Sequence, residues 1–96
     1  MRVRLSDEAE ADLDKIREYL EKRSPQGLER ILSAIFTTLG QLENFHYLGR
    51  PGRVWDTREI SVPRTPFFVV YTVSDDQCID VDAIMHERKN YPLEDE

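Results

Sequence analysis

Four side chains in the second half of the sequence are of types that could cleave RNA: Arg58, Tyr71, His86 and Arg88. An arginine can stabilise the charge that develops on the phosphorus centre, and a histidine or tyrosine can exchange a proton with the attacking or leaving oxygen. The alternative is structural: each arginine pairs with the glutamate beside it in the sequence, and Tyr71 caps the core. Composition and spacing by themselves favour this structural interpretation.

Charge is unevenly distributed along the chain. Residues 46–72 carry four arginines against two carboxylates, whereas residues 73–96 carry two basic and eight acidic side chains. The net charge of −6 argues against a surface that binds nucleic acid in general. A locally basic segment on an acidic protein fits a specific acidic partner, although ordinary solvated surface charge would give the same pattern.

The sequence contains few residues that could form a metal site, a disulfide framework or a phosphate-binding loop. Cys78 is the only cysteine, the two histidines lie far apart in the sequence, and the four glycines form no phosphate-binding loop. The four aspartates at positions 75, 76, 80 and 82 could chelate a cation, but a solvated strand face and turn is the favoured interpretation. We therefore expect no metal and no cofactor.

The length of 96 residues predicts a single domain. The sequence has no apolar stretch of membrane-spanning length, and its start turns acidic before any apolar segment of the kind that secretory signals contain. We expect a cytoplasmic protein that does not associate with membranes.

A short strand and two amphipathic helices are predicted for the first half. Arg2–Leu5 alternates, Ser6 is a candidate N-cap, and apolar residues then recur at helical spacing to about Lys22. Ser24 and Pro25 end this helix and begin a second one. The second helix has a broad apolar stripe formed by Leu28, Ile31, Leu32, Ile35, Phe36, Leu39 and Leu42. So short a break between two helices predicts an antiparallel hairpin.

Three strands joined by turns are predicted for the second half. Residues 43–56 lack periodicity and read as a loop, and strands are expected over 57–62, 67–73 and 78–85. In the last strand, alternation predicts one apolar face formed by Ile79, Val81, Ala83 and Met85. The predicted fold is α+β: an N-terminal strand and an antiparallel helical hairpin packed on an antiparallel sheet, whose other face stays open for binding.

Several segments together are similar to a known family. The run Leu48-Gly49-Arg50-Pro51-Gly52-Arg53, the later Thr57-Arg58-Glu59 and the strand Phe67-Phe68-Val69-Val70-Tyr71 resemble the signature of the RelE/ParE toxin superfamily. The ending His86-Glu87-Arg88-Lys89-Asn90-Tyr91-Pro92 is similar to that family's close. With the similar opening helix, the resemblance spans nearly the whole chain.

The resemblance implies the toxin of a type II toxin–antitoxin, or plasmid stabilisation, module. It also implies a cognate antitoxin whose disordered tail folds onto the helices and sheet of the toxin. Operator DNA would then be contacted only indirectly, through the antitoxin.

Two branches of the superfamily imply two different activities. The ParE-like branch is associated with poisoning DNA gyrase without catalysis, and the RelE-like branch cleaves messenger RNA on the ribosome. The scarcity of lysine, with none in residues 46–72, together with the acidic net charge favours the ParE-like branch. An inactive relative that serves as an interaction module is a third alternative.

Seven residues are expected to contact the target or partner on the strength of this resemblance. No residue is assigned to catalysis with certainty, although Arg58, His86 and Arg88 would serve if the chain were a ribonuclease. The expected contact residues are Arg50, Arg53, Arg58, Tyr71, His86, Arg88 and Tyr91.

The domain is expected to span residues 1–92, followed by an acidic tail over 93–96 that we expect to be disordered. The apolar stripe of the second helix is wide for one sheet face, so an antitoxin or a second copy could cover part of it. Full burial against the sheet is the alternative, which leaves the oligomeric state open.

Overall fold

A computed structural model of the chain describes residues 1–74 and 77–88. Its elements follow the predicted order, with one short extra strand. They are β1 (Arg2–Leu5), α1 (Asp7–Glu21), α2 (Pro25–Asn44), β2 (Arg50–Pro51), β3 (Arg58–Ser61), β4 (Phe67–Val73) and β5 (Cys78–His86).

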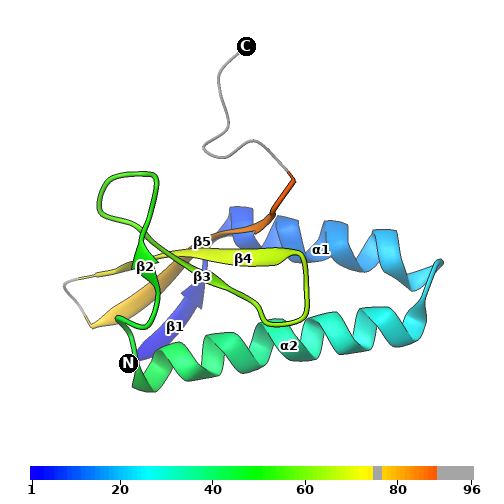
Figure 1. The fold of residues 1–96 in the computed structure, drawn as a ribbon, viewed down its shortest axis with the longest axis horizontal. Helices are drawn as coiled ribbons and strands as arrows, with labels where there is room; N and C mark the ends of the chain where they lie inside the picture. Colours follow the sequence, from blue (N-terminus) through cyan, green and yellow to red (C-terminus); the bar gives the residue numbers. More distant parts are fainter. Residues whose placement is uncertain (75–76, 89–96) are drawn as a thin grey trace, which may run out of the picture.

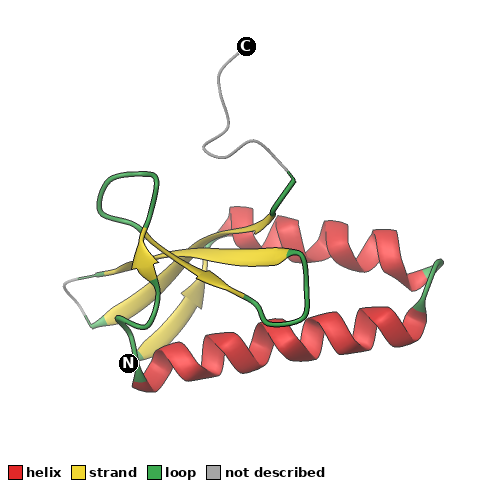
Figure 2. Cartoon of the chain, in the orientation of Figure 1, coloured by secondary structure: helices red, strands yellow, loops and turns green. Residues whose placement is uncertain are grey.

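The two helices begin where their capping residues predict. The Ser6 hydroxyl accepts a hydrogen bond from the backbone N–H of Ala9 at 3.0 Å, and the Ser24 hydroxyl accepts one from Gly27 at 3.0 Å. Each side chain satisfies a backbone donor that the first helical turn leaves without a partner. The helices run antiparallel, and their connecting turn lies beyond the end of the sheet (Figure 2).

The five strands form one mixed sheet in the order β1-β5-β4-β3-β2 (Figure 1). Strands β3, β4 and β5 pair antiparallel, as predicted, and the extra strand β2 pairs antiparallel with β3. Strand β1 pairs parallel with β5. The predicted antiparallel sheet is thus present, and the N-terminal strand makes the whole sheet mixed because it joins the edge in the parallel direction. Two parallel strands need a long connection between them, and the chain between β1 and β5 contains both helices and the other three strands.

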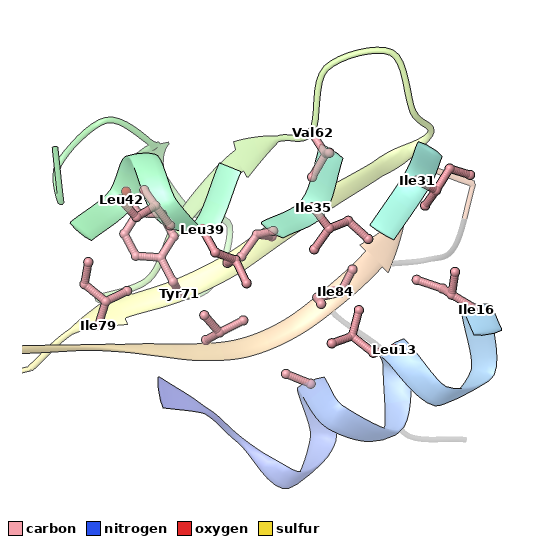
Figure 3. Packing of buried hydrophobic residues seen from close by; sticks show 13 residues of the cluster. Leu13, Ile16, Ile31, Ile35, Leu39, Leu42, Val62, Tyr71, Ile79 and Ile84 are labelled. Carbon is pink, nitrogen blue, oxygen red and sulfur yellow. The ribbon is translucent and has the colours of Figure 1, made fainter. Parts of the chain in front are cut away.

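The core lies between the helices and one face of the sheet. Figure 3 shows Tyr71 in this cluster with residues of α2 such as Leu39 and Leu42. The apolar stripe of α2 is only partly buried: Ile31, Ile35, Leu39 and Leu42 are inside, whereas the Phe36 side chain remains 49% exposed. Full burial of the stripe against the sheet is therefore not observed.

A β-bulge in β5 changes which residues share a face. Val70 pairs with Ala83 but Tyr71 pairs with Val81, so Asp82 is the extra residue. The predicted strict alternation is wrong beyond this point, since an inserted residue exchanges the two faces of a strand. Val81 and Ile84 therefore pack toward the helices, whereas Ala83 and Met85 join a second cluster with Phe68 and Val70 on the other face.

No helix in the described residues is long and apolar enough to cross a membrane. Nor do those residues contain a cluster of three or more histidine, cysteine, aspartate or glutamate side chains that could hold a metal ion.

Candidate functional site

Arg58 and Tyr71 are neighbours on β3 and β4, and both are used to hold the loop that precedes β2. The two residues pair directly in the sheet register. The buried Tyr71 hydroxyl accepts a hydrogen bond from the backbone N–H of Gly49 at 2.9 Å. Arg58 donates to the carbonyl oxygen of Gly49 at 2.7 Å, and its guanidinium lies 4.8 Å from the centre of the Tyr47 ring. Both side chains thus have structural partners in the α2–β2 loop.

The protonation of Tyr71 fits this structural use. Burial raises the pKa of the phenol above its usual value of 10.0, while the hydrogen bond from Gly49 and the charge of Arg58 act in the opposite direction. A phenol with a raised pKa keeps its proton at neutral pH. Tyr71 is therefore a poor candidate for a group that gives up a proton during a reaction.

His86 lies at the opposite end of β4 from this pair. Its partner in the register is Phe67, and the two rings meet edge to face at a centroid distance of 5.3 Å. Phe67 and Tyr71 are four residues apart on one strand, which corresponds to roughly 13 Å. The Nδ1 atom of His86 accepts a hydrogen bond from the backbone N–H of Arg88 at 3.0 Å.

These positions do not bring the four side chains together around one open sheet face, which is the arrangement that RNA cleavage by them would need. Register places Arg58, Tyr71 and His86 on the face that the helices cover, and the bulge in β5 contributes to this orientation. Arg88 follows β5 and is exposed, and Tyr91 lies outside the described residues. The site anticipated for RNA cleavage is not assembled among the residues that the structure describes.

Arg50 and Arg53 converge instead on Glu59, a buried carboxylate that the sequence suggested only as a partner of Arg58. Arg50 Nη2 lies 3.2 Å and Arg53 Nε 3.4 Å from Oε1 of Glu59. The backbone N–H of Arg53 also donates to Oε2 at 2.9 Å. Arg58 was expected to pair with its neighbour Glu59, but alternation along β3 directs the two side chains to opposite faces.

This cluster fixes the loop between β2 and β3 across the second sheet face. The Arg53 guanidinium lies 5.1 Å from the centre of the Phe68 ring, so the loop covers part of the second apolar cluster. Each arginine keeps about half of its side chain exposed. Both arginines can therefore still attract an acidic partner while they hold the loop.

A groove with an apolar floor lies where His86 and Phe67 approach the helices. Its volume is about 440 Å³, and it opens between α1, the start of α2 and the adjoining ends of β4 and β5. The lining residues are Asp12, Lys15, Ile16, Tyr19, Leu20, Ile31, Pro66, Phe67, Ile84 and His86. Asp12 also accepts a hydrogen bond from the backbone N–H of Ile84 at 2.9 Å, which joins α1 to the end of β5.

The aspartates considered as cation ligands have other partners. Asp80 pairs with Arg4 at 2.8 Å, and Asp82 accepts a hydrogen bond from the Thr72 hydroxyl at 2.7 Å. Burial raises the pKa of Asp82, and the nearby Asp80 and Glu8 act in the same direction against the Thr72 hydrogen bond. Asp75 and Asp76 lie outside the described residues.

Comparisons with known proteins agree with this fold and with the resemblance found in the sequence. Residues 3–91 match the family described as ParE toxin of type II toxin-antitoxin system, parDE. A protein of Sinorhizobium fredii (strain NBRC 101917 / NGR234), named "Putative toxin Y4kP", is 32% identical over 91 residues, which are 95% of this chain and 93% of that protein.

Solved structures are similar over most of the chain. The chromosomal ParDE system of P. aeruginosa contains a chain with 25% identity and a TM-score of 0.67, and the alignment covers 90% of this protein and 95% of that chain. A chain of the toxin–antitoxin complex RelBE2 from Mycobacterium tuberculosis has 21% identity and a TM-score of 0.57, with 88% and 95% covered, and supports the fold alone. Taken with the family match over residues 3–91, these similarities establish that the protein belongs to the ParE toxin family of type II toxin–antitoxin systems.

Proposed function

We propose that this toxin acts on DNA gyrase by binding and without catalysis of its own. The observation that carries the proposal is the separation of the residues that RNA cleavage would need. Arg58 and Tyr71 are engaged with the backbone at Gly49, and His86 is about four strand residues away from them. General acid–base catalysis needs its groups within hydrogen-bond reach of the same reacting atoms.

Charge supports the same proposal. The chain carries a net charge of −6, and only three of its residues are lysines. Binding within the ribosome would bring this acidic protein against a dense array of phosphates, which repel it. A protein target such as gyrase imposes no such requirement, and we place its action in the cytoplasm, where gyrase works.

We further propose that a cognate antitoxin neutralises the toxin by occupying the groove beside His86. Apolar side chains such as Leu20 and Phe67 line this groove, and Lys15 and Asp12 lie at it with opposite charges. An amphipathic segment of a partner chain that folds on binding would bury these apolar groups. The family match and the similar chain in the chromosomal ParDE system of P. aeruginosa both belong to toxin–antitoxin systems, and so support an antitoxin partner.

Residues 1–92 are proposed to act as one toxin domain, since β5 joins the N-terminal β1 to the later strands. The acidic segment 93–96 lies outside the described residues.

Expression of the chain alone in bacteria tests the target. Growth arrest with a DNA damage response and continued early translation is expected, and the purified protein should inhibit gyrase supercoiling. His86→Ala should leave both effects intact, because His86 has no catalytic role in the proposal. An immediate stop in translation that His86→Ala abolishes would contradict the proposal and favour ribonuclease action, whereas the absence of arrest would indicate an inactive interaction module.

The antitoxin groove is tested with Tyr19→Ala. Tyr19 lines the groove but is 60% exposed, so its removal should leave the fold intact. Binding of the cognate antitoxin should weaken by about tenfold or more if the ring is buried by the partner. Phe45→Ala is the matched control, since Phe45 is an exposed aromatic residue directly after α2 that does not line the groove. Equal effects of the two substitutions would argue against the groove.

A further inference from the structure

Trp55, the only tryptophan of the chain, is 89% exposed at the end of the β2–β3 loop. Tryptophan side chains in folded proteins are on average largely buried, because exposure of the large apolar ring to water is unfavourable in free energy. No other large apolar side chain in residues 1–74 and 77–88 is as exposed. The neighbouring Val54 is also partly exposed, at 38%. The loop that presents these side chains projects from the sheet (Figure 1).

Hydrogen bonds within the loop give it a defined shape. The backbone N–H of Gly52 donates to the Thr57 carbonyl oxygen at 2.7 Å and closes the loop at its base. The Thr57 hydroxyl donates to the Val54 carbonyl oxygen at 2.6 Å, and the Thr57 backbone N–H donates to the same oxygen at 3.2 Å. Asp56 adopts a left-handed conformation with φ of 68°, as tight turns of this kind require.

The base of the loop is fixed to the sheet by Glu59. This carboxylate is 1% exposed and holds both Arg50 and Arg53, as described above. A buried charge is costly unless it is paired and hydrogen-bonded, so the cluster constrains the loop strongly. The exposed indole is therefore held on a structured loop before any partner binds, which lowers the entropy lost on association.

The surroundings of Trp55 favour a protein partner over a nucleic acid. Asp56 follows the indole directly and would repel phosphate, and the whole chain is acidic. Val54, which directly precedes Trp55 in the sequence, adds to the exposed apolar surface. The half-exposed Arg50 and Arg53 at the base of the loop would attract carboxylates at the edge of an interface. The matching partner is a protein with an apolar pocket and an acidic rim.

We propose that Trp55 is the anchor by which this toxin binds its protein target, with the Glu59 cluster acting to position the loop. Buried aromatic residues at the centre of an interface commonly carry most of the binding energy. The identity of the target as gyrase rests on the proposed function, whereas the role of Trp55 as anchor rests on the loop itself. The antitoxin groove is formed by other residues, so the two surfaces are separate.

Substitution of Trp55 tests its role in toxicity. Trp55→Ala should weaken inhibition of gyrase supercoiling by at least about tenfold and relieve growth arrest, and Trp55→Phe should retain part of the activity. Its high exposure means that neither change should affect folding, which urea unfolding of both variants would verify. Phe36→Ala, which removes another exposed aromatic side chain, should inhibit gyrase as strongly as the wild-type chain. Full toxicity of Trp55→Ala would overturn the inference.

A label on the indole tests contact directly. Incorporation of fluorotryptophan gives a signal from position 55 alone, because the chain has no other tryptophan. Addition of purified gyrase should shift or broaden this ¹⁹F resonance, and addition of bacterial ribosomes should leave it unchanged. A resonance that gyrase leaves unchanged, although the same protein inhibits gyrase, would overturn the inference. A resonance that responds only to ribosomes would overturn both the protein partner and the proposed function.

The two sets of results separate the anchor from the target. If the wild-type chain arrests growth without inhibiting gyrase, and Trp55→Ala relieves that arrest, then gyrase is the wrong target but Trp55 is still the anchor. If the wild-type chain and the Trp55→Ala variant inhibit gyrase equally, then the proposed function stands and Trp55 is not the anchor. If the wild-type chain neither arrests growth nor inhibits gyrase, both are wrong.

Discussion

Glu59 and Arg53 are joined twice, once through the side chain and once through the backbone. The buried carboxylate accepts a hydrogen bond from the backbone N–H of Arg53 at 2.9 Å and lies 3.4 Å from its Nε atom. Two contacts between the same pair fix both the position and the direction of the chain where it enters the β2–β3 loop. A glutamate on β3 thereby controls the loop that carries Trp55.

Removal of this carboxylate should destabilise the protein. Glu59→Ala is expected to lower the free energy of unfolding by about 2 kcal/mol, less than for a fully buried pair because the arginines are half exposed. Urea unfolding measures the change, and Glu59→Gln should lose less because its amide oxygen can still accept from Arg53. Asp14→Ala is the control, since it breaks only an exposed pair with Arg17. Similar losses for Glu59→Ala and Asp14→Ala would show that the Glu59 cluster does not stabilise the fold.

Two glycines should respond in opposite ways to alanine. A Cβ at Gly49 would meet the Tyr71 hydroxyl at 2.7 Å and the Glu59 carbonyl oxygen at 2.8 Å, so Gly49→Ala should cost about 2 kcal/mol. A Cβ at Gly40 would meet nothing within 4 Å, and this residue lies inside α2. Gly40→Ala should therefore stabilise the protein by about 0.5–1 kcal/mol. Thermal unfolding of both variants checks the prediction, which would fail if Gly49→Ala were neutral.

Loss of the Tyr71 hydroxyl should affect stability without affecting the action of the folded protein. Tyr71→Phe leaves the Gly49 backbone N–H without its acceptor and should cost about 1–3 kcal/mol. Inhibition of gyrase per folded molecule should be unchanged, because the hydroxyl is buried. Tyr47→Phe, at an exposed ring, should alter stability by less than about 0.5 kcal/mol. A loss of inhibition by a folded Tyr71→Phe variant would give the hydroxyl a functional role.

Asp82 should make the free energy of unfolding vary with pH in the acidic range. Because burial raises its pKa above 3.8, the folded state holds this proton more tightly than the unfolded state does. The free energy of unfolding therefore falls as the pH rises from 3.8 through the raised pKa. Asp82→Asn removes this loss and can still accept the hydrogen bond from Thr72. It should be more stable than the wild-type chain at pH 7.

The gain from Asp82→Asn should disappear near pH 3, where the wild-type carboxyl is protonated in both states. Urea unfolding at the two pH values measures the difference, with the exposed Asp14→Asn as control. A stability difference that is the same at both pH values would show that the charge of Asp82 is not its cause.

The sequence by itself determined the local elements. Ser6 and Ser24 cap their helices, and the apolar periodicity of α1 and α2 depends only on residues a few positions apart. The strand Phe67–Val73 was predicted with its observed bounds because its β-branched and aromatic residues favour extended backbone wherever it lies in the sheet. Similarity to the RelE/ParE superfamily was also recognisable, since it is carried by residue types in order.

Only the tertiary structure decided where the arginines and the bulge lie. Strand pairing brings Arg50 against Glu59, separates Arg58 from that carboxylate and aligns it with Tyr71. The bulge at Asp82 exchanges the faces of β5 and so contributes to the position of His86 in the groove beside α1. Contacts of this kind depend on register between distant segments, and a shift of one residue would reverse every side chain on a strand. The exposure of Trp55 was equally hidden, because a tryptophan in a loop gives no sign in the sequence of whether the fold will cover it.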